Sequence, residues 1–171
     1  MTRKDKIRMK VWKSMMEKRA ALPPFPIYGR IPNFKGATEA ALKLRGLEEY
    51  ARARVLLCNP DSPQRPVREN ALRDGKTLIV ATPRLSRGFV VIEKSEEPLY
   101  HSTIRGIMER GEPVNPGDYN IDLFIAGSVA VSPEGYRLGK GTAYSDIEYR
   151  LWQKAGSIND RTIKITTVHD L

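Results

Sequence analysis

The sequence predicts an α/β fold with a mostly parallel sheet and helices on both faces. Short apolar segments that are typical of buried strands alternate along the chain with segments of helical periodicity. The longest apolar segment, 121–131, is interrupted only by Asp122, Gly127 and Ser128, and such a strand is typical of a parallel sheet covered on both sides. A length of 171 residues suits one domain, so we expect a single α/β unit over 1–171.

The composition is that of an ordinary globular protein, with 40% hydrophobic and 29% charged residues. No apolar run approaches the roughly 20 residues that cross a bilayer, and no apolar segment follows the basic N-terminus as in a signal peptide. The single cysteine, Cys58, excludes an intramolecular disulfide. We therefore expect a cytoplasmic protein with no membrane partner.

The net charge of +9 is concentrated at the N-terminus, where residues 1–20 carry eight Lys or Arg and two Asp or Glu, a net +6. Such a local excess suits a nucleic acid, a polyanionic small ligand such as a nucleotide, or a solvated helix face. No RNP-type, helix-turn-helix or zinc-finger pattern accompanies it. Nucleic acid is therefore the least favoured of these three interpretations.

The first predicted helix spans residues 3–20, with an apolar stripe formed by Ile7, Val11, Trp12 and Met15. Lys4 and Arg8 fall within this stripe, one turn apart. A charge that faces the protein body costs free energy unless a partner neutralises it. The two side chains either extend past the helix end to solvent or form a phosphate clamp, in which Arg supplies a fork and Lys a point charge.

The remaining elements follow in order. Residues 21–36, with four prolines and two glycines, predict an ordered loop. A helix is expected over 37–51, with Ala41, Leu44, Leu47 and Ala51 on one face, and another from Pro66 to a stop at Gly75. Strands are expected at 54–58, 77–81, 89–92, 121–131 and 162–168. Two further helices are expected at 101–110, with Ile104, Ile107 and Met108 inward, and at 143–155, and residues 113–118 are expected to be loop.

Two loops of this arrangement, 59–66 and 135–146, follow predicted strands. Ligands of open α/β sheets bind outside the carboxyl ends of the strands. We therefore expect both loops to open on one edge of the sheet and to share one site.

The second loop reads GYRLGKGTAYSD over 135–146. Glycines let a backbone approach a ligand closely, and the helix that follows would offer unpaired N–H groups to an anion. The stretch is not a Walker loop, because Gly141 separates Lys140 from Thr142, and it is not a dinucleotide fingerprint, because Tyr144 occupies the third glycine position. Its pattern alone is compatible with an anion site or with a structural turn.

Residues 137–146, RLGKGTAYSD, resemble the signature R-L-G-x-G-x-G-Y-Y-D of 5-formyltetrahydrofolate cyclo-ligases, also called methenyltetrahydrofolate synthetases. Lys4 and Arg8 reproduce the N-terminal K-x-x-x-R of that family, and 121–131 is similar to the strand before its signature. Further blocks resemble the methenyltetrahydrofolate synthetase domain-containing subfamily: Arg30–Ala37, Asn59–Asp61, Pro83–Leu85 and Asp146–Tyr149.

The resemblance implies a fold like that of the NagB/RpiA/CoA-transferase superfamily, and ATP and Mg²⁺ as cofactors. It implies that ATP is bound by Lys4, Arg8, Arg137, Leu138, Gly139, Lys140, Gly141, Thr142, Ala143, Tyr144 and Ser145. Arg137 and Lys140 would neutralise the reacting phosphate, and Asp146 would hold Mg²⁺. Asp61, at a strand end, is a candidate for the reduced-folate pocket.

The implied reaction is the ATP- and Mg²⁺-dependent conversion of 5-formyltetrahydrofolate to 5,10-methenyltetrahydrofolate, or a close variant. Ala143 replaces the third glycine of the signature and Ser145 its second tyrosine, and both replacements bear on substrate choice. A non-catalytic nucleotide- or folate-binding module is the alternative, with RNA binding a third. The chain stops at 168–171, where members of the family continue, so we expect the closing segment of the fold to be missing. We expect His169 to be structural.

Overall fold

A six-stranded sheet forms the centre of the computed structural model, which describes residues 1–171. Its strand order is β10–β7–β3–β4–β5–β6. The strands are β3 (Val55–Cys58), β4 (Thr77–Ala81), β5 (Phe89–Ile92), β6 (Glu112–Val114), β7 (Leu123–Ala126) and β10 (Ile163–Thr166). The first four in spatial order run parallel, β5 runs antiparallel to β4, and β6 runs antiparallel to β5. The predicted α/β class with a mostly parallel sheet is confirmed.

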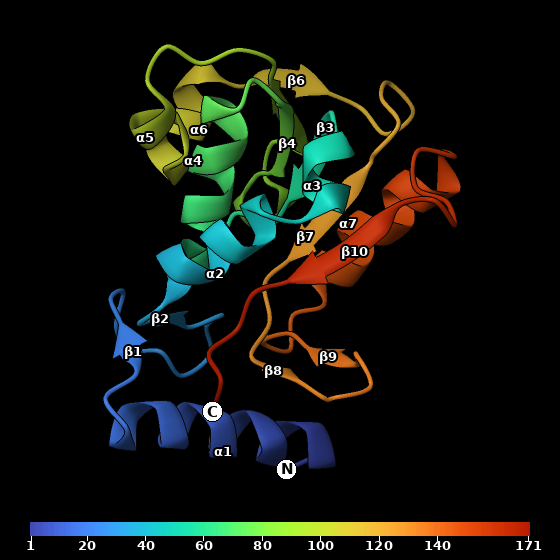
Figure 1. The fold of residues 1–171 in the computed structure, drawn as a ribbon. Coiled ribbons are helices and arrows are strands. Elements are labelled where there is room, and N and C mark those ends of the chain that lie inside the picture. The colour runs from blue at the N-terminus through green and yellow to red at the C-terminus, as the bar shows by residue number, and fades with distance from the viewer.

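Helices cover both faces of this sheet (Figure 1). Alternate strand residues point to opposite faces, so Leu56 of β3 belongs to one apolar cluster and Leu57 to another. The first cluster includes residues of α2 (Ala37–Arg45), α3 (Glu48–Arg52), α4 (Arg65–Arg73) and α6 (Ile104–Arg110). The second packs against Trp152 of α7 (Tyr144–Lys154), which is completely buried.

Helix α1 (Arg3–Glu17) lies outside these layers, at one end of the molecule (Figure 1). A capping box between Thr2 and Asp5 fixes its start. Trp12 and Met15 bury its inner face in a third apolar cluster, together with residues of the proline-rich loop and Val129. Ile7 is predicted to face inward but is 38% exposed, whereas the neighbouring Arg8 is half-buried.

Two predicted helices are each divided in the structure. The predicted helix 37–51 becomes α2 and α3, separated at Gly46 and Leu47, and this interruption shifts the helical phase. Leu47 and Ala51 are therefore exposed and Tyr50 is buried instead. The predicted helix 101–110 becomes α5 (Pro98–His101) and α6, because the Thr103 hydroxyl caps a new start.

The buried residues of the predicted helix 101–110 also differ from the prediction. Ile107 is buried, Met108 is half-buried, and Ile104 is 36% exposed. The predicted loop 113–118 contributes the edge strand β6 at its start. Gly75, with a φ of 73°, follows the end of α4 as expected.

The predicted strand 121–131 leaves the sheet after Ala126 and resumes as β8 (Ala130–Val131). β8 pairs with β9 (Arg137–Leu138) in a separate hairpin, and β1 (Ala21–Leu22) pairs with β2 (Asn33–Phe34) in another. Short 3-10 turns follow β3 (Ser62–Gln64) and β4 (Pro83–Leu85). None of the helices combines the length and the apolar character needed to cross a bilayer.

Candidate functional site

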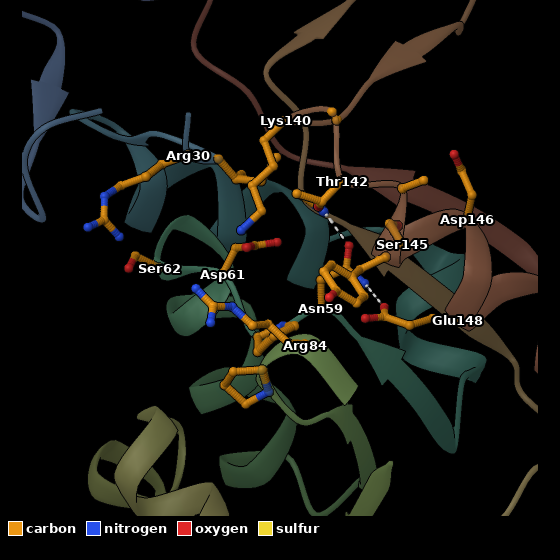
Figure 2. Close-up of a pocket in the computed structure, with 18 of the residues that line it drawn as sticks. Arg30, Asn59, Asp61, Ser62, Arg84, Lys140, Thr142, Ser145, Asp146 and Glu148 are labelled. Carbon is orange, nitrogen blue, oxygen red and sulfur yellow. Dashed lines mark hydrogen bonds between the residues drawn. The ribbon is translucent and has the colours of Figure 1, made fainter. Parts of the chain in front are cut away.

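A cavity of about 460 Å³ opens at the carboxyl ends of the central strands. The loop after β3 lines one side through residues 59–62, and the glycine stretch with the start of α7 lines another. Lys4 and Arg8 of α1 also line the cavity. The two loops therefore lie together, as the strand order predicts, and Figure 2 shows their side chains facing one space.

Asn59, at the end of β3, joins the two loops. Its side chain accepts a 2.9 Å hydrogen bond from the Gly127 amide and donates one to Glu148 of α7 (Figure 2). The fully buried guanidinium of Arg68 donates to the Asn59 and Asp61 carbonyl oxygens at 2.8 and 2.9 Å. These contacts satisfy polar groups that burial would otherwise penalise, and they fix the floor of the cavity.

The glycine stretch is held by two of the predicted phosphate ligands. Arg8 donates from Nε to the Gly139 carbonyl oxygen at 2.8 Å, and its Nη1 pairs with Asp5 at 2.8 Å. Arg137 donates from Nε to Ser128 Oγ at 3.1 Å and from Nη2 to the Gly127 carbonyl oxygen. Both guanidinium groups line the cavity while they position its walls.

Helix α7 directs its first turn into the cavity. Ala143 precedes the helix with a φ of 60° and supplies no side-chain cap. The first N–H groups of a helix have no intrahelical partner, and here they adjoin Gly139, Lys140, Gly141 and Thr142, which also line the cavity. A left-handed backbone is strained at a residue with a Cβ, so Ala143 adopts at a cost the conformation that suits the glycine of the signature.

The two lysines predicted to bind phosphate have no partner within the chain. Lys4 and Lys140 line the cavity, and neither ammonium makes a hydrogen bond or ion pair within the chain. Figure 2 shows the Lys140 side chain extending towards Asp61. Leu138 is the exception among the predicted nucleotide ligands: it pairs with β8 and does not line the cavity.

Asp146 lies at the edge of the site, with a side chain that is 69% exposed and 3.6 Å from Arg137 Nη1. No group of three His, Cys, Asp or Glu side chains is placed to hold a metal ion. Mg²⁺ in nucleotide sites is commonly held by one or two carboxylates together with phosphates and water. A single carboxylate beside the glycine stretch fits that mode of binding.

Two carboxyl groups lie deeper in the cavity, and one of them was not predicted. Asp61 is the predicted one. Burial raises its pKa, and the nearby charges of Lys140 and Arg68 oppose that effect. Glu148 is 3% exposed, and burial together with the Asp61 charge raises its pKa to about 8. The helical spacing of Glu148 and Trp152, one turn apart on the buried face of α7, is the sequence signal that could have identified it.

Further polar groups line the cavity, one of them predicted and two not. The Ser145 hydroxyl, at a predicted nucleotide ligand, is buried without a hydrogen-bond partner and lines the cavity beside half-buried Tyr144. Arg30 and Arg84 line the opposite end. His169 lies elsewhere, edge-on to the Phe34 ring with centroids 6.2 Å apart. A separate small groove of about 100 Å³ includes it.

Comparison with known proteins identifies the family of the chain. A sequence model of the 5-formyltetrahydrofolate cyclo-ligase family matches residues 1–171. The chain belongs to the 5-formyltetrahydrofolate cyclo-ligase family. It is 43% identical to a methenyltetrahydrofolate synthase domain-containing protein of Danio rerio over 171 residues, 96% of this chain and 45% of the relative.

Mammalian relatives carry the same description. The identity is 39% to the Mus musculus protein and 35% to the Homo sapiens protein, over 98% of this chain and 47% and 45% of those proteins. The chain thus spans about half the length of the curated relatives it matches. The family resemblance of the sequence is confirmed, and the α/β fold agrees with it.

Proposed function

We propose that the chain catalyses the ATP-dependent closure of 5-formyltetrahydrofolate to 5,10-methenyltetrahydrofolate. The observation that carries the proposal is the cavity itself, where a glycine loop, a helix N-terminus and four cationic side chains meet the carboxyl groups of half-buried Asp61 and buried Glu148. Membership of the cyclo-ligase family supports this reaction class.

The glycine-loop end suits the triphosphate. Lys4, Arg8, Arg137 and Lys140 would offset its charge, with Arg8 and Arg137 already anchored to the loop carbonyls. The amides of residues 139–142 and of the first turn of α7 would donate to the phosphate oxygens. Thr142, Tyr144 and Ser145 line the same surface, and the unpaired Ser145 hydroxyl would gain a partner there.

The reaction needs no nucleophilic side chain. The formyl oxygen attacks the γ-phosphorus and ADP departs; N10 of the folate then attacks the activated formyl carbon, and phosphate and the N10 proton leave. Positioning and electrostatic stabilisation of the transferring phosphoryl group would therefore dominate catalysis. Lys140, which has no partner within the chain, would neutralise the charge as it moves from the nucleotide to the formyl oxygen. Asp146 would hold Mg²⁺, which neutralises phosphate charge when bound.

The deep carboxyl groups suit the folate ring. A 2-amino-4-oxopyrimidine ring presents several N–H donors, and buried carboxyl oxygens accept such donors strongly. Asp61 makes no side-chain hydrogen bond within the chain and is therefore free to accept one from a ligand. This would place the folate ring on the cavity floor with its formyl group towards Lys140.

A non-catalytic nucleotide- or folate-binding module is the second candidate. Two observations favour it: Ala143 is strained where the family signature has glycine, and Ser145 replaces a signature tyrosine. RNA binding through the basic first helix is the third candidate. A salt-dependent affinity for RNA with no affinity for Mg-ATP would favour it over both.

The absorbance of methenyltetrahydrofolate, followed with and without Mg-ATP, tests the proposal. The unmodified chain should form product only with Mg-ATP. Asp146→Ala and Lys140→Ala should abolish turnover, while Lys13→Ala, on the exposed face of α1, should not. Unchanged turnover in Asp146→Ala would exclude the metal assignment, and nucleotide binding by calorimetry without product would select the non-catalytic module.

A further inference from the structure

The cavity has a second cationic end, remote from α7 and formed by Arg30, Ser62 and Arg84. In Figure 2 these three residues lie on one side of the cavity, and Thr142, Ser145 and Asp146 lie on the other, with Asp61 and Lys140 between them. The three come from different segments, namely the proline-rich loop, the turn after β3 and the turn after β4. The proposed phosphate site uses none of them.

Arg84 sits in a strained turn. Both Arg84 and Leu85 have left-handed backbones, with φ of 55° and 56°. The turn is tied at its base: the Thr82 hydroxyl donates to the Gly88 carbonyl oxygen at 2.8 Å and accepts from the Arg87 amide at 2.9 Å, and the Thr82 amide donates to the same carbonyl at 2.9 Å. Two consecutive strained residues persist only where the surroundings fix them. Here the turn places Arg84 in the lining of the cavity.

These cationic groups lack partners. The Arg84 guanidinium and the Ser62 hydroxyl make no hydrogen bond or ion pair within the chain. Arg30 is tethered by a 2.8 Å bond from Nε to the Pro26 carbonyl oxygen, which orients the group and leaves both Nη atoms free. Unpaired guanidinium groups favour carboxylate or phosphate ligands, which they bind with two parallel hydrogen bonds.

We propose that Arg30, Arg84 and Ser62 form a second anion subsite, which binds the carboxylates of the amino-acid tail of the folate. The inference rests on the proposed function and deepens it. With the triphosphate at the glycine loop and the folate ring on the floor, the tail is the remaining anionic part of the two substrates. Pro83, next to Arg84 in the chain, and the exposed Ile104 also line the cavity and would offer apolar surface to the aromatic linker that joins ring and tail.

The subsite makes Arg84 a specificity residue for folates that carry a tail. Because Arg84 is exposed, water screens part of its interaction. We therefore expect Arg84→Gln to weaken binding of 5-formyltetrahydrofolate by about tenfold, a size suited to one charge-assisted bidentate contact. Arg30→Gln should have a similar effect, and it supplies an independent variant on a different loop.

The chain offers a matched control, Arg87, an exposed arginine of the same turn that does not line the cavity. Calorimetry would measure the affinities of the unmodified chain and of Arg84→Gln, Arg30→Gln and Arg87→Gln for three ligands. These are 5-formyltetrahydrofolate, 5-formyltetrahydropteroate, which lacks the amino-acid tail, and Mg-ATP. Arg84→Gln and Arg30→Gln should weaken only the first, and Arg87→Gln none.

Three other outcomes would each contradict the proposed anion subsite. Equal affinity of the unmodified chain for the two folates would show that the tail is not bound, and it would not contradict the proposed function. A loss confined to Mg-ATP would assign the guanidinium groups to the nucleotide phosphates. No affinity for either folate would refute the proposed function together with the subsite.

Discussion

The substitution Glu148→Gln isolates the energetic cost of a carboxyl group on the cavity floor. Glu148 is 3% exposed and accepts a hydrogen bond from Asn59, a contact that the amide oxygen of glutamine preserves. Burial and the neighbouring Asp61 raise the Glu148 pKa from 4.5 to about 8. Between these values the folded chain holds a proton that the unfolded chain has released.

The sign and size of the effect follow from this difference in proton binding. A raised native pKa gives stability that is complete below pH 4.5 and is lost as the pH rises towards about 8. Each pH unit in the interval costs at most about 1.4 kcal/mol, which sets a ceiling of about 5 kcal/mol. Local relaxation and water entry reduce this, so we expect about 2–4 kcal/mol. The glutamine variant does not pass through this titration.

Urea unfolding at pH 5, 6, 7 and 8 measures the difference directly. The free energy of unfolding of Glu148→Gln, relative to that of the unmodified chain, should increase as the pH rises. Glu49→Gln, an exposed position on α3, should follow the unmodified chain at every pH. A difference between Glu148→Gln and the unmodified chain that stays constant from pH 5 to 8 would refute the reasoning.

Three further predictions concern packing, loop support and reactivity. A Cβ at Gly127 would lie 2.5 Å from Asp61 Oδ2, so Gly127→Ala should cost about 1–3 kcal/mol in urea unfolding and should also weaken ligand binding by calorimetry. Arg8→Gln removes the bond to the Gly139 carbonyl oxygen and a phosphate partner, so Mg-ATP affinity should fall about tenfold or more, with the melting temperature changing by only a few degrees. Burial raises the pKa of Cys58 to about 12, so thiol reagents should modify the native chain only as it unfolds.

The meeting of the two loops could be predicted from the sequence because it depends on topology alone. β3 and β7 are parallel neighbours, so the segments that follow them emerge at the same edge of the sheet. Lys4 and Arg8 fall within the predicted apolar stripe of α1, a position compatible with extension to solvent or with a phosphate clamp, and both line the cavity. In both cases the pattern reports which face or edge a residue occupies.

The parts that could not be predicted depend on tertiary contacts. Glu148 lies on the cavity floor because Asn59, distant in sequence, binds it there. The left-handed turn at Arg84 is imposed by hydrogen bonds around Thr82, and no glycine signals it. The division of the predicted helix 37–51 shows that one glycine, Gly46, can shift a helical phase that a continuous pattern assumes.

The central claim is that this cavity couples ATP to closure of the folate ring. The most direct measurement is the rate at which methenyltetrahydrofolate absorbance appears when the unmodified chain and Lys140→Ala are mixed with 5-formyltetrahydrofolate and Mg-ATP. The account predicts an ATP-dependent signal from the unmodified chain and none from the variant. Affinity for both ligands without product from the unmodified chain, or equal rates from the two proteins, would contradict it.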